Sequence, residues 1–440
     1  MTESSPVLDR LGAQISAMAP YLPAGRLQSA HGALIEARLS QGAIGELCEV
    51  FDPSTGRRTE ADLIGFREGI ALLAPSDRLD GLSPAAEIRT SGRRRDVPVG
   101  RGLLGRVIDP RGRPLDGQGR LCGIEGRRRL EATPPPAMER RPITRPFPVG
   151  IRAIDGVLTC GAGQRIGVFG EPGGGKSTLL AALVRGSKAP VCVIGLVGER
   201  GREVREFVED TLGTDGLARS VVVVATSDQP AVERASAALA ATSVAEHFRD
   251  AGQDVLLVID SITRFARARR DLALASGALP ARRGYPPSAL AELPALLERA
   301  GCSDRGSITA IYTVLIEGDG TGDPVAEDIR GILDGHIMLS PDLAAKGHYP
   351  AIDITRSKSR IMPRVTDDAQ RGWAADIVAM MAKLDEIELL VQVGEYSAGS
   401  DPLADRALAA RKSLMAFLRQ TADEVTPIAE VWAGLKAVAT

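Results

Sequence analysis

The sequence predicts an α/β protein, in which a largely parallel sheet around a glycine-rich loop follows a small β domain and precedes a helical domain. Residues 170–177, GEPGGGKS, fit the pattern GxxxxGK[ST]; they follow the apolar run RIGVFG and open the helix-like run STLLAALV. Further apolar runs rich in β-branched residues recur between residues 190 and 315, separated by helix-length segments. Continuous rather than alternating hydrophobicity is typical of strands buried on both faces, and hence of a parallel sheet.

The chain before the sheet divides into two predicted regions. Residues 1–24 hold apolar residues at helical spacing, namely Leu8, Leu11, Ile15 and Met18. This spacing leaves an amphipathic partner-binding helix and a frayed terminus as alternatives. Residues 25–95 alternate apolar and polar positions in short runs broken by Gly, Pro and Asp, which predicts a small β-barrel domain.

The central and final regions are predicted to differ in periodicity. The central domain spans residues 96–365, and six prolines between residues 134 and 148 predict a linker or a wrapped surface segment inside it. Residues 366–440 change to a period of 3.6, as in ADIVAMMAKLDEIELLVQVG. A C-terminal helical domain is therefore expected.

Composition narrows the function classes. The chain has 440 residues, with 44% apolar residues, 25% charged residues and a formal net charge of −2. Aromatic residues, at 3%, are too scarce for a base-stacking surface, so no nucleic-acid partner is expected. The five cysteines are scattered without CxxC spacing, and neither a signal peptide nor an 18-residue apolar span is found. These features favour a reducing cytoplasm.

The glycine-rich loop predicts a nucleoside triphosphate site. Glycines let backbone N–H groups converge on phosphate oxygens, and the positive end of the following helix adds attraction. We expect Lys176 to reach the β- and γ-phosphates and the Ser177 hydroxyl to hold Mg²⁺. The predicted cradle consists of Gly170, Gly173, Gly174, Gly175, Lys176, Ser177 and Thr178.

Two further motifs supply carboxylates. Asp260 ends the apolar run DVLLVID in the manner of a Walker B motif, where it would support Mg²⁺ at the carboxyl edge of the sheet. Glu199, in VGERGRE, is our candidate for orienting the attacking water, with Arg200 contacting the γ-phosphate and Glu203 tuning the pair. The alternative for these three residues is a surface salt-bridge cluster. The basic run SITRFARARR is interpreted as a solvated or interface face.

Several motifs carry a resemblance to a known family. The segments GERGRE, DSITRFARA, RRGYPPS, YTVLIEGDG and GHYPAIDI resemble rotary-type ATPases related to the F1 β subunit. Within that group, LTCGAGQRIGVFG, GGGKSTLL and ELLVQVGEYSAGSDPLADRALAARKSLMAFLRQ are most similar to ATPases of type III secretion systems, with the flagellar export ATPase as a close sibling. The resemblance covers roughly residues 25–435 and implies a RecA-like P-loop ATPase core.

The resemblance also implies how the site is completed. It implies a homohexameric ring that hydrolyses ATP with Mg²⁺, with each nucleotide lying between neighbouring subunits. Arg360, in SKSR, matches the arginine finger that enters the site of the next subunit. Two charged residues depart from the family pattern, Glu171 in the glycine-rich loop and Lys358 beside the finger. The base selectivity of the site is left open by the motifs.

The partners implied by the resemblance belong to an export apparatus. They are a stator-like regulator at the N-terminus, a central stalk protein in the pore, and export chaperones with their cargo at the helical domain. The ring is expected in the cytoplasm, peripheral at the cytoplasmic face of the inner membrane, where it releases chaperones and unfolds cargo at the export gate.

The sequence leaves three alternative functions. The first is a flagellar protein export ATPase. The second is a Rho-like nucleic-acid translocase, suggested by the basic stretches at residues 91–95 and 126–129, although these read better as a solvated or inter-subunit surface. The third is a non-catalytic subunit of the ATP synthase type, against which the presence of Glu199 argues.

Overall fold

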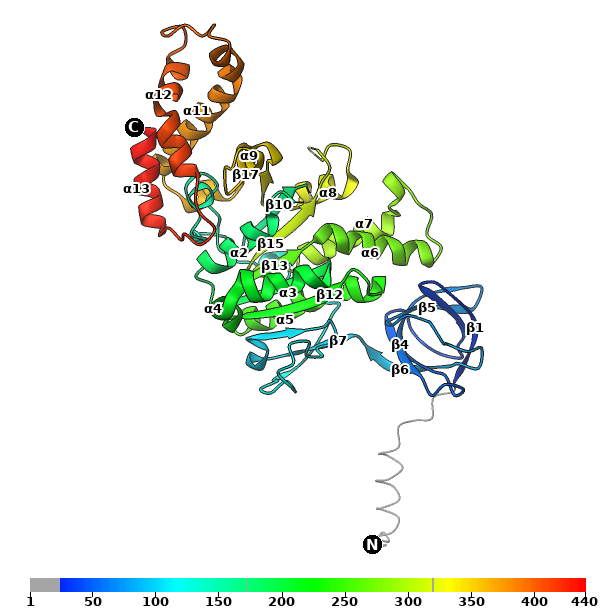
Figure 1. Ribbon diagram of the computed structural model, residues 1–440. Helices are drawn as coiled ribbons and strands as arrows, with labels where there is room; N and C mark the ends of the chain where they lie inside the picture. Colours follow the sequence, from blue (N-terminus) through cyan, green and yellow to red (C-terminus); the bar gives the residue numbers. More distant parts are fainter. Residues whose placement is uncertain (1–23, 172, 319) are drawn as a thin grey trace, which may run out of the picture. The chain divides into compact units, whose positions relative to one another are not determined.

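The computed structural model describes residues 24–171, 173–318 and 320–440, and the chain forms two compact units (Figure 1). The first unit ends at Arg94 and the second runs from Arg95 to Thr440. The helical spacing predicted within residues 1–24 lies outside the described residues. No helix in the described part of the chain is both long and apolar enough to cross a membrane.

The first unit is a closed six-stranded barrel with the strand order β1-β2-β5-β4-β3-β6. Its strands alternate buried and exposed positions, and Ile35, Val50, Leu63 and Ile88 form its core with no exposed surface. Closure removes the unpaired strand edges that would otherwise invite aggregation. The strands are β1 (Gly25–His31), β2 (Leu34–Arg38), β3 (Glu46–Phe51), β4 (Arg58–Arg67), β5 (Ile70–Pro75) and β6 (Glu87–Arg94). The predicted β-barrel is confirmed.

The second unit is built on a nine-stranded sheet with the order β17-β16-β10-β15-β13-β11-β12-β8, in which β14 pairs with β15. The strands from β16 to β8 are parallel, whereas β17 runs antiparallel at the edge. The strands are β8 (Arg106–Ile108), β10 (Arg165–Gly170), β11 (Val191–Glu199), β12 (Ser220–Thr226), β13 (Asp254–Asp260), β14 (Gly301–Cys302), β15 (Ser307–Leu315), β16 (Gly335–Leu339) and β17 (Ile352–Ser359). The predicted parallel α/β core is thereby confirmed.

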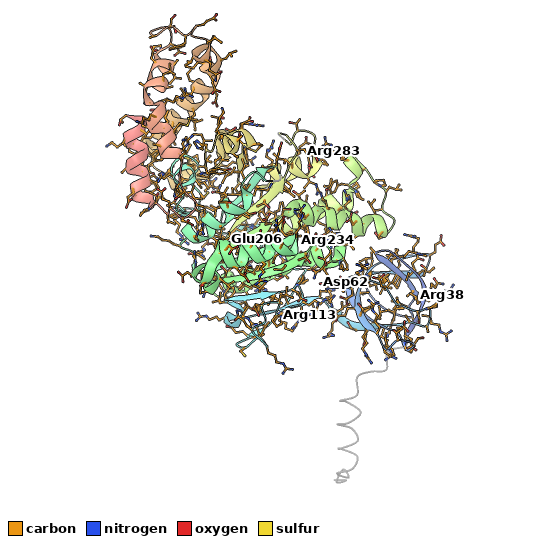
Figure 2. All side chains as sticks on the ribbon, in the orientation of Figure 1. Arg38, Asp62, Arg113, Glu206, Arg234 and Arg283 are labelled. Atoms are coloured by element: carbon orange, nitrogen blue, oxygen red, sulfur yellow. The ribbon has the colours of Figure 1, made fainter. Side chains whose placement is uncertain are left out.

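Helices follow most of the parallel strands and cover the sheet. Helix α5 packs on β11, β12 and β13, and its Arg234 pairs with Asp271 of the adjacent α6 at 3.2 Å (Figure 2). The helices are α2 (Lys176–Gly186), α3 (Gly201–Glu206), α4 (Gly213–Ala218), α5 (Ala231–Asp250), α6 (Ile262–Ala275), α7 (Pro287–Leu297), α8 (Pro324–Ile332), α9 (Pro341–Ala345) and α10 (Met362–Val365).

The C-terminal region is helical, as predicted. It comprises α11 (Asp368–Gln392), α12 (Pro402–Leu418) and α13 (Ile428–Ala439). Asp367 caps α11 in a capping box and accepts from Gln370 N–H, and Asp401 caps α12 and accepts from Leu403 and Ala404 N–H. Ile377, Met380 and Leu414 are fully buried where these helices meet.

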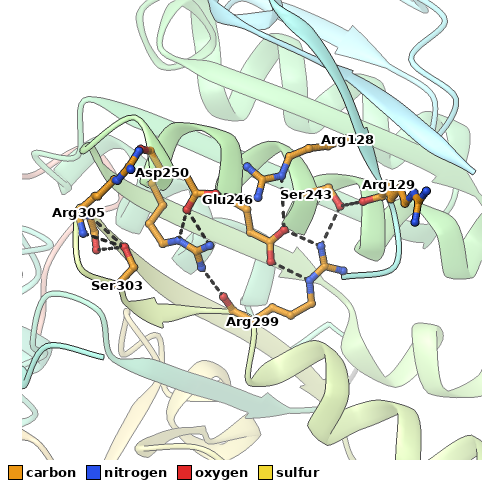
Figure 3. A network of polar contacts seen from close by, with 10 residues as sticks. Arg128, Arg129, Ser243, Glu246, Asp250, Arg299, Ser303 and Arg305 are labelled. Atoms are coloured by element: carbon orange, nitrogen blue, oxygen red, sulfur yellow. Dashed lines mark hydrogen bonds and ion pairs between the residues drawn. The ribbon is translucent and has the colours of Figure 1, made fainter. Parts of the chain in front are cut away.

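Next to a buried ion pair of the core, hydrogen bonds hold the segment of residues 96–148, called the strap below. Arg299, 1% exposed, donates to both carboxylate oxygens of Glu246 at 2.9 and 2.8 Å and to the carbonyl of Leu130 at 2.6 Å (Figure 3). Further along the strap, Arg140 donates to Ala300 O at 3.3 Å. The proline-rich segment is therefore wrapped against the core. The strap also contains the ribbon of β7 (Asp96–Val99) and β9 (Gly126–Arg129).

We expect Arg299→Leu to lower the free energy of unfolding of the second unit by about 3–5 kcal/mol, because it leaves Glu246 buried and unpaired. Combining it with Glu246→Leu should recover most of the loss. Arg305→Ala is the matched control, since the Arg305–Asp304 pair is exposed. Denaturant unfolding of the variants measures the effect, and equal losses for Arg299→Leu and Arg305→Ala would contradict the argument.

Candidate active site at the carboxyl edge of the sheet

The phosphate-binding loop (P-loop), residues 170–177, has the backbone that its glycines predict. Gly173 and Gly175 have φ values of 82° and 79°, a region that side-chain-bearing residues rarely adopt. The structure places the predicted cradle residues between the end of β10 and the first turn of α2: Gly170, Gly173, Gly174, Gly175, Lys176, Ser177 and Thr178. The Ser177 side chain is exposed there, at the helix N-terminus. The loop is thus shaped to receive phosphate oxygens.

Lys176 is buried inside this loop. Its Nζ donates to the carbonyl oxygens of Gly170 at 2.7 Å and Glu171 at 2.8 Å. Burial lowers the pKa of Lys176 to about 8, while the negative charges of Asp260 and Glu199 act in the opposite direction. The ammonium therefore has two weak neutral acceptors, and phosphate oxygens are stronger acceptors for it.

Asp260 lies beside Lys176 at the end of β13. Its Oδ1 accepts a hydrogen bond from the Thr313 hydroxyl at 2.5 Å, and its side chain is buried. Burial raises the pKa of Asp260, and the hydrogen bond from Thr313 and the charge of Lys176 oppose that rise. A divalent cation at this point would favour the ionised carboxylate. Ser177 and Asp260 therefore fit Mg²⁺ by the chemistry of their oxygens.

Glu199 ends β11 at the same edge. Its Oε2 forms an ion pair with Nη2 of Arg264 at 3.0 Å, and Arg264 also donates to the carbonyl of Gly198. Burial raises the pKa of Glu199 to about 8, the charge of Asp260 adds to the rise, and Arg264 opposes it. A carboxylate with a raised pKa is a stronger proton acceptor once ionised. Glu199 therefore has the properties of a group that polarises water.

Two arginines lie differently from the sequence interpretation. Arg200 is 76% exposed and its guanidinium pairs with Glu203 at 3.0 Å. Glu203 in turn hydrogen-bonds Glu199 and adds to the rise of the pKa of Glu199. Arg264, in the run interpreted as a solvated or interface face, contacts Glu199 in the site and is 26% exposed. The solvated alternative was therefore wrong for Arg264. One signal was present, because Arg264 lies one helical turn after Asp260, in the first turn of a helix that starts at the sheet edge.

Arg360 is far from the P-loop of its own chain. Its backbone N–H donates to Asp334 O at 2.9 Å, and Asp334 N–H donates to Arg165 O at 2.9 Å. Arg165 is the first residue of β10, whereas Gly170, the last, starts the P-loop. Five strand residues separate these levels by about 16 Å. Arg360 therefore lies at the amino edge of the sheet, and the other predicted site residues lie at the carboxyl edge.

Comparisons with known proteins identify the family. Residues 150–359 match the nucleotide-binding domain of the ATP synthase alpha/beta family, and residues 366–437 match the T3SS EscN ATPase C-terminal domain. A type 3 secretion system ATPase of Sinorhizobium fredii is 55% identical over 406 residues, 92% of this chain and 90% of that protein. The chain belongs to the type III secretion ATPase family. A flagellum-specific ATP synthase of Bacillus subtilis is 43% identical over 94% of this chain and 95% of that protein.

Solved structures agree with this assignment. The assembled ATPase EscN of the enteropathogenic E. coli type III secretion system has a TM-score of 0.90 and 43% identity, covering 94% of this chain and 100% of its own. EscN in complex with its central stalk EscO has a TM-score of 0.87 and 42% identity, with the same coverage. The secretion ATPase thus has the predicted fold, hydrolyses ATP and energises type III export; the flagellar relatives fit no better.

The secretion ATPase also has an apolar pocket beside the P-loop that no motif revealed. Tyr349 lines it, together with Ile151, Gly175, Thr178, Leu179, Ala182, Leu339, Pro350, Ala351, Gln420, Thr421 and Ala422. The carboxamide of Gln420 is already used: its Nε2 donates to Gly150 O and Glu424 O, each at 2.7 Å, and its Oε1 accepts from Arg152 N–H at 2.8 Å. The pocket suits a nucleobase but directs no carboxamide at the base edge.

We expect kcat/KM for GTP to lie within about tenfold of that for ATP, because strong discrimination requires polar groups that hydrogen-bond the base. Steady-state kinetics with both nucleotides measures the ratio. In Gln420→Ala the turn between α12 and α13 should loosen, and KM should rise equally for ATP and GTP. A preference for ATP of a thousandfold would contradict this account of the pocket.

The pH dependence of kcat/KM should form a narrow bell near pH 8. Glu199, with a pKa of about 8, must lose its proton, and Lys176, with a pKa of about 8, must keep its own. Arg264→Gln should move the acid limb to higher pH, because Arg264 lowers the pKa of Glu199. The control Arg202→Gln, in an exposed pair with Glu206, should leave the limb in place. An acid limb near pH 4.5, the usual pKa of glutamate, would refute the role of Glu199.

Proposed function

We propose that copies of this ATPase form a homohexameric ring whose shared sites hydrolyse ATP to release chaperones and unfold cargo at the export gate. One observation carries the proposal. Lys176, Glu199 and Asp260 lie at the carboxyl edge of the sheet, while Arg360 lies at its amino edge about 16 Å away. One chain therefore has both parts of a site but does not join them. A head-to-tail arrangement of identical copies joins them and closes as a ring.

In the proposed mechanism each side chain has a separate task. Lys176 would exchange its two carbonyl acceptors for phosphate oxygens of ATP, and Ser177 and Asp260 would hold Mg²⁺. When bound, Mg²⁺ would neutralise part of the charge of the phosphates. Glu199, ionised, accepts a hydrogen bond from the attacking water and orients it. The ion pair with Arg264 fixes the direction of that carboxylate.

Two arginines complete the proposed mechanism. Arg360 of one copy enters the site of the next and stabilises negative charge on the phosphoryl group, a contribution worth about 10³-fold or more in other nucleotide hydrolases. Arg200 would contact the γ-phosphate after leaving Glu203, to which it is paired on the surface. The exposure of both side chains is consistent with groups that wait for a partner.

The relatives support two of the proposed contacts. EscN is assembled and binds a central stalk, so we propose the same for this ring. A stator-like regulator at the N-terminus, chaperones at the helical domain and a position at the cytoplasmic face of the inner membrane complete the proposal. The basic stretch at residues 126–129 gives little support to a Rho-like translocase. Arg127 forms an ion pair with Asp96 and Arg128 with Asp250, so these charges are already partly neutralised.

Mixing two inactive variants tests the shared site. Arg360→Ala and Glu199→Gln should each lose about 10³-fold in kcat. In mixed rings, the site of an Arg360→Ala copy can receive the intact finger of a Glu199→Gln copy, so an equal mixture should recover about a quarter of wild-type activity. Steady-state ATP hydrolysis after mixing is the measurement.

The matched control mixes two variants defective on the same side of the site, Glu199→Gln and Asp260→Asn. No interface in that mixture has a complete site, so it should stay inactive. If the Arg360→Ala and Glu199→Gln mixture also stays inactive although both variants assemble, Arg360 does not act on a neighbour. Near wild-type activity of Arg360→Ala alone would have the same meaning.

A further inference from the structure

A row of positive charges follows the edge strand β17. Arg356 and Lys358 are alternate residues of β17, and Arg360 directly follows its last residue, Ser359. The three alternate with the less exposed Ser357 and Ser359, so they lie on one side of the chain. All three are exposed. None has an ion-pair partner among the residues that the structure describes. Burial lowers the pKa of His336 on the neighbouring strand β16, and the charges of Arg360 and Lys358 act in the same direction.

The P-loop contains a carboxylate that its own task does not explain. Glu171 directly follows Gly170, and its backbone carbonyl lies 2.8 Å from Nζ of Lys176. Its Oε1 accepts a hydrogen bond from Gly318 N–H at 3.0 Å, and the side chain is half-buried. A negative charge at this point repels the triphosphate that the loop must hold. The charge of Glu171 acts on Lys176 of the same loop, but that ammonium must also serve the phosphates. A second cation close to the loop would therefore be needed to neutralise Glu171.

The cation cannot come from β17 of the same chain. In the register of the sheet, Lys358 of β17 lies opposite His336 of β16, and His336 lies opposite Gly167 of β10. Lys358 therefore lies level with the first half of β10. Arg360, just past the end of β17, lies level with Arg165, because its backbone N–H donates to Asp334, whose N–H donates to Arg165. That level is about 16 Å from the P-loop. A second copy of the chain, docked with its amino edge on this carboxyl edge, brings the two charges together.

We propose that Lys358 of one copy forms an ion pair with Glu171 of the next copy, so that β17 docks on the neighbouring P-loop through two cations with different targets. Arg360 reaches the phosphoryl group, and Lys358 neutralises the loop carboxylate. The Cα atoms of Lys358 and Arg360 are two positions apart and so at most about 7 Å from each other. This distance allows one side chain to reach a phosphate and the other a carboxylate on adjacent parts of one loop. Lys358 is thus a positioning residue. The inference rests on the proposed shared site and adds its second contact.

Cross-linking tests the proximity without relying on activity. Glu171→Cys and Lys358→Cys are made separately, each with Cys122→Ser to remove the exposed native thiol. Mixing them with a non-hydrolysable ATP analogue and a short bis-maleimide should give a covalent dimer. Glu171→Cys mixed with Lys412→Cys is the control, because Lys412 is an exposed residue of α12 and should give none. Equal dimer yields in the two mixtures would overturn the proposal.

Charge exchange tests the ion pair itself. Glu171→Lys and Lys358→Glu should each weaken oligomer formation at least tenfold, measured by sedimentation with the ATP analogue. Glu171→Gln, which keeps the acceptor for Gly318 N–H and loses the charge, should weaken it less. The double variant and the mixture of the two single variants should both recover assembly to within about threefold, since a charge pair in either orientation is equivalent by Coulomb's law. Lys412→Glu should have no effect.

The outcomes separate the inference from the proposed function. If the Arg360→Ala and Glu199→Gln mixture recovers activity but charge exchange does not restore assembly, the shared site stands and the Lys358–Glu171 pair is wrong. If the double variant recovers and the mixture of single variants does not, the two residues interact within one chain and the proposal is also wrong. If neither activity nor assembly recovers in any mixture, the shared site itself fails.

Discussion

The parallel register of β10, β15, β13 and β11 is the constraint on which the site depends. Gly170 pairs with Leu315, Ile259 with Tyr312, and Leu196 with Asp260, so these strands reach one edge of the sheet together. Residues from segments far apart in the sequence meet there because each strand ends at the same level. A slip of one residue would turn every side chain of a strand to the other face and disperse the site.

Each charged side chain of the site has a polar partner within the same chain. Lys176 donates to two loop carbonyls, Glu199 pairs with Arg264, and Asp260 accepts from Thr313. Each buried charge therefore has a partner, which limits the cost of burying it. The same burial moves the pKa values of Lys176 and Glu199 toward neutrality, so the arrangement that keeps the fold stable also prepares the groups for proton and phosphate chemistry.

The sequence predicted what is local and missed what depends on distant contacts. The P-loop, Asp260 and Glu199 were accessible because each follows a buried strand directly in the sequence. Arg264 was missed because its contact with Glu199 joins two strand ends, and a basic helix in isolation looks solvated. The pocket lined by Tyr349 and Gln420 was missed for a similar reason, since its walls come from segments spread along the chain from Ile151 to Ala422. The helical spacing in residues 1–24 stays a prediction.

The apolar pocket beside the P-loop is lined by residues of both the central and the helical domain. Gln420 and its neighbours belong to the turn between α12 and α13, yet they close the pocket against Tyr349, and Arg152 donates to the carbonyl of Phe417 at 2.8 Å. The helical domain is therefore a structural component of the catalytic unit. A chimaera that exchanges helical domains between secretion ATPases at residue 366 would also exchange one wall of the nucleotide site. Nucleotide affinity would thus change with the helical domain as well as with the P-loop.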